Sequence, residues 1–128
     1  MESVGRDPKN IPPLTRPMFY ILLALVDGER HGYSIMQEIA SQTGGNFHIG
    51  PTTLYRSIKR MLDLGMIVET DERPDPDLDD ERRRYYRLTM LGLYAARMEK
   101  SRLSEALAVA NEKGLDGEIS LSPACGGA

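Results

Sequence analysis

Basic and hydroxyl side chains recur along residues 52–60 at a spacing that places them on one side of a predicted helix. At about 100° per residue, the apolar side chains Leu54 and Ile58 fall on the opposite side. Arginine can donate two hydrogen bonds to a guanine edge, and lysine or threonine can contact base edges or phosphate. The stretch therefore carries groups suited to contacting duplex DNA: Thr52, Thr53, Tyr55, Arg56, Lys59 and Arg60.

Taken alone, this face has a second interpretation as a solvated helix surface, because exposed helices commonly carry lysine and arginine. The sequence that follows favours the first interpretation. A polar acidic turn and the stretch ERRRYYRLT predict a hairpin directly after the helix. A helix followed at once by a β-ribbon is a layout that can set the helix in a duplex groove and the ribbon beside it.

A second basic group, Arg82, Arg83 and Arg84, stands at the start of the returning strand. Segment 71–81 holds seven acidic residues and one arginine, whereas segment 82–87 holds four arginines and no acid. Strand alternation lets at most two of the three arginines share a face. They could contact phosphate or the minor groove, or they could pair with the neighbouring carboxylates, which would weaken their attraction to DNA. We expect the acidic turn itself to stay outside the groove.

The elements that position these groups follow from capping and periodicity signals. Four helices are predicted, over 18–26 after a Thr15 cap, 32–43, 51–64, and from a Thr89 cap to about Lys113. Residues 66–88 are predicted to form the hairpin, and strand alternation predicts one inward and one outward tyrosine at Tyr85 and Tyr86. Residues 47–49 could be a short strand or a bridge.

This order of elements predicts a mainly α fold with a small β-hairpin, a winged helix-turn-helix followed by a C-terminal dimerisation helix. We expect an N-terminal arm at 1–14, the DNA-binding domain at 15–89, the dimerisation helix at 90–113 and a flexible tail at 114–128. The formal net charge of −3 argues against a generally basic surface, but the positive charge is concentrated where this fold needs it.

Other chemistries find little support in the residues. His31 and His48 are not spaced as metal ligands, and the acidic turn lacks the glycine and glutamate of a calcium loop. No catalytic set or glycine-rich phosphate loop is evident, so we expect no cofactor, no metal and no enzymatic activity. No apolar run is long enough to span a membrane, and the single cysteine, Cys125, is consistent with a reducing cytoplasm.

Three stretches of the sequence resemble the PadR-like family of transcriptional regulators. They are FYILLALVDGERHGYSI with His31-Gly32-Tyr33, PTTLYRSIKRMLDLGMI with Leu54-Tyr55 and Leu64-Gly65, and RRRYYRLTMLG with Tyr85-Tyr86-Arg87-Leu88-Thr89 and Gly92. Together they cover about residues 18–92 in the family's order. Two features depart from the family's pattern. The acidic turn argues against contact between the wing tip and DNA, and the C-terminal part is one helix plus a tail, which suits the short branch of the family.

The resemblance implies a winged-helix dimer that represses transcription, often in response to small aromatic or amphipathic compounds. It implies that the third helix reads the major groove, with Tyr55 and Arg56 contacting DNA. It also implies that Tyr85 and Tyr86 support the wing and that the helix after Thr89 dimerises.

The last helix has a reason to pair that does not depend on the resemblance. Burying a large apolar side chain stabilises by about 1.5–3 kcal/mol, so an amphipathic helix leaving a small domain favours self-association over exposure. The alternative is that this helix packs back on its own domain. The dimerisation residues predicted are Leu91, Tyr94, Ala95, Met98, Leu103 and Leu107.

Two-fold symmetry would place the two recognition helices about 34 Å apart, which predicts an inverted-repeat operator. The expected partners are therefore double-stranded DNA, a second copy of the chain and a small apolar or aromatic effector that releases it. A rival interpretation, favoured by the acidic composition, is a winged-helix protein-interaction module that does not bind DNA.

Overall fold

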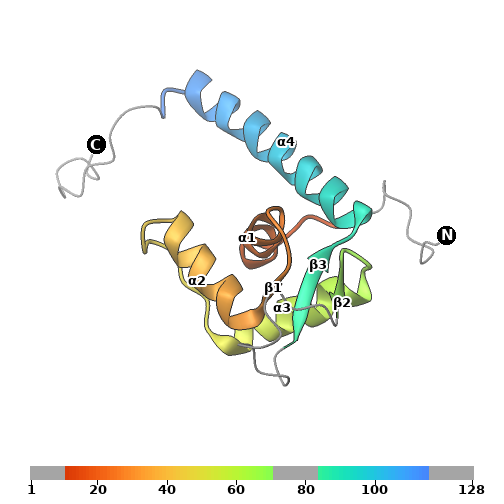
Figure 1. Ribbon diagram of the computed structural model, residues 1–128. Coiled ribbons are helices and arrows are strands. Elements are labelled where there is room, and N and C mark those ends of the chain that lie inside the picture. Colours follow the sequence, from red (N-terminus) through yellow and green to blue (C-terminus); the bar gives the residue numbers. More distant parts are fainter. Residues whose placement is uncertain (1–10, 71–83, 116–128) are drawn as a thin grey trace.

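The computed structural model describes residues 11–70 and 84–115 of the chain. Its elements are α1 (Arg16–Leu25), β1 (Arg30–His31), α2 (Gly32–Gln42), α3 (Pro51–Asp63), β2 (Ile67–Thr70), β3 (Tyr85–Leu88) and α4 (Met90–Glu112) (Figure 1). The predicted acidic turn, Arg82, Arg83, Cys125, and most of the predicted arm and tail lie outside the described residues. None of the helices within these ranges is long and apolar enough to cross a membrane.

Side-chain caps define where three of the helices begin. Thr15 Oγ1 accepts a hydrogen bond from Met18 N–H at 3.3 Å, and Thr89 Oγ1 accepts one from Gly92 N–H at 3.0 Å. Both caps were predicted, because threonine satisfies a free N–H of the first helical turn. The cap of α2 is His31, whose Nδ1 accepts from Ser34 N–H at 3.2 Å. The four predicted helices are therefore confirmed, with ends that differ from the prediction by a few residues.

The sheet has three antiparallel strands in the order β1-β3-β2, so the predicted two-stranded hairpin is extended by β1. Glu69 pairs with Tyr86 across β2 and β3, and His31 pairs with Tyr85 across β1 and β3. Residues 47–49 form no strand. The Phe47 N–H instead donates to Thr43 Oγ1 at 3.1 Å, and its ring packs 5.1 Å from that of Tyr20.

The core lies where α1 contacts α2, α3 and α4. Tyr85 and Tyr86 are both buried, at 5% and 3% exposure, so the prediction that one of them faces outward is wrong. The reason is that other side chains cover both faces of β3. Tyr86 packs in the main core, while the Tyr85 ring meets His31 edge-on at 5.3 Å.

The described end of the predicted arm belongs to the folded domain. Leu14 is buried in the core, and Ile11 packs against it. At the other end of the chain, α4 begins beside β3, crosses α1 and continues away from the other elements (Figure 1). Helix α3 lies on the opposite side of α1 from α4 in this view, so its outer face is directed away from α4.

Candidate nucleic-acid interface

Helix α3 separates its apolar and polar side chains onto opposite faces. Leu54, Ile58 and Met61 are buried in the core. This periodic burial turns every α3 residue of the predicted DNA-binding set toward solvent, and all six are exposed: Thr52, Thr53, Tyr55, Arg56, Lys59 and Arg60.

The basic side chains of this face have few acidic neighbours. Lys59 lies 3.8 Å from Asp63, but both side chains are more than 60% exposed, and such a surface pair contributes little. Within the described ranges, neither Arg56 nor Arg60 forms an ion pair. The face is therefore cationic and accessible.

The first turn of α3 leaves backbone N–H groups available. Its N-cap is Gly50, which provides no side-chain hydrogen bond, and Pro51 in the first turn has no N–H to satisfy. The N–H groups of Thr52 and Thr53 and their hydroxyls thus lie together at the positive end of the helix dipole. Such an arrangement suits an anionic oxygen.

Tyr55 is held at the crossing of α2 and α3. A Cβ added to Gly32 would lie 2.4 Å from Tyr55 Oη, so the phenol rests directly on the α2 backbone, and the ring is still 49% exposed. Tyr33, which the sequence reasoning did not assign, follows Gly32 in the chain and is 59% exposed. Helical periodicity carries this signal, because it places Tyr33 opposite the buried Ile35.

The hairpin presents its basic groups differently. Arg84 Nη1 lies 2.6 Å from Glu69 Oε2, and this hydrogen-bonded carboxylate raises the pKa of the Arg84 guanidinium above its ordinary value. Arg87 lies 3.6 Å from Glu29. The sequence left open whether the strand arginines pair with acids. For Arg84 the partner is Glu69 of the facing strand.

Tyr86 links the hairpin to α3. Burial raises the pKa of its phenol above the ordinary value of 10.0, and the neighbouring Glu69 and Tyr55 raise it further, while Arg84 opposes the shift. Tyr86 therefore stays protonated at neutral pH.

The predicted dimerisation residues fall into two groups. Ala95 is only 1% exposed and belongs to the protomer's own core, which removes it from a dimer surface, and Leu91 is half-buried. The reason is that the first half of α4 packs on α1. Tyr94, Met98, Leu103 and Leu107 are between 38% and 61% exposed.

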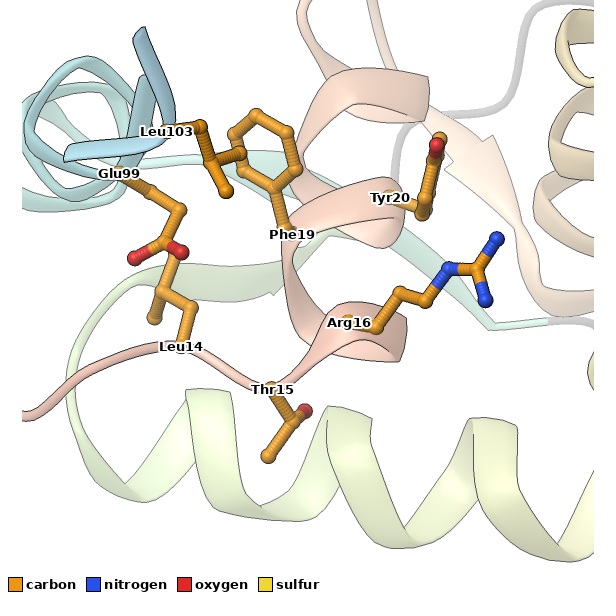
Figure 2. Close-up of a pocket in the computed structure, with 7 residues that line it drawn as sticks. All are labelled: Leu14, Thr15, Arg16, Phe19, Tyr20, Glu99 and Leu103. Atoms are coloured by element: carbon orange, nitrogen blue, oxygen red, sulfur yellow. The ribbon is translucent and has the colours of Figure 1, made fainter. Parts of the chain in front are cut away.

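A cavity of about 330 Å³ opens where α4 leaves the domain. Figure 2 shows Phe19 of α1 beside Leu103 of α4, with Leu14 beneath Glu99. Glu99 is 8% exposed and pairs with Arg102 on the same helix. The Arg16 guanidinium points away from this apolar end (Figure 2). It lies 4.0 Å from the Phe47 ring centre.

Neither the composition of the site nor its geometry points to metal chemistry. In the part of the chain that the structure describes, no group of three His, Cys, Asp or Glu residues could hold an ion. His31, one of the two histidines, serves as the α2 cap.

A three-helix core, a three-stranded sheet and an accessible cationic third helix define a winged helix-turn-helix protein of the DNA-binding class. The sequence model of the PadR-like family of transcriptional regulators matches residues 21–98 of this chain. The chain belongs to this family, whose members are DNA-binding regulators rather than enzymes.

Two solved structures share this fold, and one relative matches part of the sequence. A transcriptional regulator from Clostridium thermocellum is 27% identical, with a TM-score of 0.66 over 75% of this chain and 87% of that one. A PadR family transcription regulator from Clostridium difficile is 22% identical, with a TM-score of 0.63 over 77% of this chain and 97% of that one. An uncharacterized protein from Lysinibacillus sphaericus is 37% identical over 73 residues, which are 56% of this chain and 63% of that protein.

Proposed function

We propose that this chain is a cytoplasmic, homodimeric, sequence-specific repressor that places α3 in successive major grooves of an inverted-repeat operator. The observation that carries the proposal is the exposed basic face of α3, where Arg56 and Arg60 have no carboxylate partner within the described residues. A major groove about 12 Å wide admits one helix, and arginine can discriminate guanine by two hydrogen bonds. Thr52, Thr53, Lys59 and the Tyr55 hydroxyl would add contacts to bases or phosphate.

The proposed dimer is supported by an apolar stripe that runs beyond the protomer's own core. In the first half of α4, Gly92, Ala95 and Ala96 face the domain. The same face continues at helical spacing through Leu103, Leu107 and Ala110, but residues 101–109 are all exposed. A helical segment as short as residues 101–109 is marginal in water when nothing packs against it. Packing against a second copy would therefore stabilise it.

The proposal includes a small apolar effector that binds beside α4. The cavity between α1 and α4 has the volume of a small-ligand pocket and lies beside the proposed dimer surface. A small apolar compound bound there would alter the packing of α4 and thereby release the operator.

The DNA-binding proposal is tested by replacing Arg56 and Lys59 with alanine. We expect operator affinity to fall at least 100-fold in a gel-shift titration, because each good base contact contributes about 1–3 kcal/mol. The matched control is Arg97→Ala with Lys100→Ala, which removes the same two residue types at the same spacing from exposed positions of α4. Equal losses in both variants would contradict a specific role for α3.

The dimer proposal has its own test. Leu107→Glu puts a charge on the apolar stripe, whereas Ser104→Glu puts the same charge on a polar face of α4, and both positions are exposed. Light scattering after gel filtration should find a monomer for the first variant and a dimer for the second. Two dimers of wild-type stability would remove this stripe from the interface.

A further inference from the structure

The end of α3, the start of β2 and the first turn of α4 meet in one backbone junction, formed by residues 65–66 and 89–92. The Thr89 hydroxyl donates to Gly65 O at 2.6 Å, and the Thr89 N–H donates to Met66 O at 3.0 Å. The same hydroxyl oxygen accepts from Gly92 N–H. One side chain therefore caps α4 and also ties it to the end of α3.

Gly92 lets the two segments approach this closely. A Cβ at this position would lie 2.0 Å from Met66 O, a backbone atom that cannot swing aside as a flexible side chain can. Met66 is itself fully buried, and its N–H donates to Met61 O in the last turn of α3 at 2.9 Å. The start of α4 is thus fixed to the end of α3 through backbone groups.

We infer that this junction is a positioning site that sets the direction of α3 relative to α4, and with it the operator spacing that the dimer accepts. The inference rests on the proposed function, in which α4 joins the protomers and α3 enters the groove. Helix α3 has 13 residues and is about 20 Å long. A rotation of about 10° at its fixed end would move the far end by about 3 Å, close to the rise of one base pair.

The junction can be weakened without removing the domain's core. Ala95 and Ala96 of α4 are buried in the core, and they hold α4 on the domain independently of Thr89. Loss of one hydrogen bond at the junction therefore leaves the fold in place, while it removes a direct tie between the end of α3 and the start of α4.

The test compares Thr89→Ser with Thr89→Asp. Serine keeps the hydroxyl that donates to Gly65 O. Aspartate keeps a capping acceptor for Gly92 N–H but has no proton to donate to Gly65 O. Each full-length variant and the wild type select paired half-sites with variable spacers from a random DNA pool, and circular dichroism and light scattering monitor fold and mass.

We expect Thr89→Ser to choose the wild-type spacing with wild-type affinity. Thr89→Asp should bind the wild-type operator at least 10-fold more weakly and prefer a spacer that differs by one or more base pairs. The added negative charge weakens binding to any DNA, but it does not move the preferred spacing. The same preferred spacing for both variants would overturn the inference, whatever their affinities.

Gly92→Ala provides a second and independent test. Alanine is a better helix former than glycine, so this substitution does not weaken α4 itself. A changed spacing preference in this variant therefore results from the contact between the new Cβ and Met66 O. An unchanged preference counts against the inference, and so does unfolding of both Thr89→Asp and Gly92→Ala, because the junction would then be needed for folding. If the wild type selects no paired half-sites, the proposed function fails as well. If it does and the variants select the same spacing, only this inference fails.

Discussion

The two basic regions of this protein differ in whether their arginines have carboxylate partners. On α3, Arg56 and Arg60 extend into solvent with no ion pair among the described residues, whereas Arg84 of the hairpin lies 2.6 Å from Glu69. A paired arginine gains less from phosphate, because its first partner must be displaced or left beside the DNA backbone. The difference indicates that surroundings, more than residue type, decide which arginines can bind DNA.

Single substitutions in each region test most directly whether the two sets of arginines contribute differently to operator affinity. Arg56→Ala should weaken operator binding by about 10- to 100-fold, since a bidentate arginine–guanine contact contributes about 1–3 kcal/mol. Arg84→Ala should change it by less than about threefold, because the guanidinium is already held by Glu69 in an exposed pair. Fluorescence anisotropy with labelled operator measures both. A larger loss for Arg84→Ala would reverse the assignment.

The position of Tyr55 on the α3 face depends on its contact with the α2 backbone at Gly32, and Gly32→Ala disturbs that contact. The new Cβ would lie 2.4 Å from Tyr55 Oη and 3.2 Å from Leu54 Cδ2. Because the half-exposed Tyr55 side chain can swing aside, relieving this overlap should reduce the free energy of unfolding by only about 1 kcal/mol and displace Tyr55 from the α3 face. Urea unfolding measures the first effect and operator affinity the second.

Tyr55→Ala provides the matched background for this experiment. Once the ring is gone, Gly32→Ala should become much less destabilising, which gives a coupling energy in a double-mutant cycle. Additive effects of the two substitutions would mean that Tyr55 does not rest on Gly32.

Most of the fold could be predicted from local signals, because the helices begin and end at residues with specific backbone preferences. Thr15 and Thr89 cap helices, and Gly65, with φ of +80°, follows the end of α3. The strand β1 could not be predicted, since two residues carry no periodicity and their pairing is decided by β3. The burial of both Tyr85 and Tyr86 has the same origin, because alternation predicts a face but not what covers it.

The α3 part of the candidate site could be predicted because helical periodicity separates buried from exposed positions. Leu54 and Ile58 define the inner face, so the outer face follows. The pairing of Arg84 could not be predicted. It depends on the register that sets Glu69 opposite Tyr86, and the acidic turn gave several closer carboxylates in sequence. Ala95 was misassigned for a similar reason, because the angle at which α4 crosses α1 is a tertiary property.

The two basic regions should differ less in their contribution to DNA affinity when Arg84 loses its carboxylate partner. Glu69→Gln removes a negative charge and frees the guanidinium, so affinity for DNA of any sequence should rise about two- to fourfold at low salt. The gain should disappear at high salt, where such contacts are screened. Anisotropy titrations with operator and unrelated DNA test this. A gain that persists in an Arg84→Ala background would mean that Arg84 does not mediate it.

The smallest expected effect concerns the tyrosine that joins the hairpin to α3. Burial and the nearby Glu69 raise the pKa of Tyr86 above 10.0 in the folded protein, so the unfolded chain loses this proton first. The stabilisation is therefore fully present below about pH 10 and is lost as the pH rises through the folded-state pKa. Tyr86→Phe should lose less stability than wild type between about pH 9 and about pH 11, as measured by urea unfolding at each pH.

Tyr33→Phe is the control for this titration, because it also removes one phenol but from a ring that is 59% exposed. Its stability should follow the wild-type pH curve. Because Glu69 contributes to the raised pKa of Tyr86, Glu69→Gln should also flatten the alkaline loss, while it frees Arg84 in the DNA-binding experiment. If Glu69→Gln changes DNA affinity and leaves the alkaline stability curve as in wild type, then Glu69 acts on Arg84 alone, and burial accounts for the raised pKa of Tyr86.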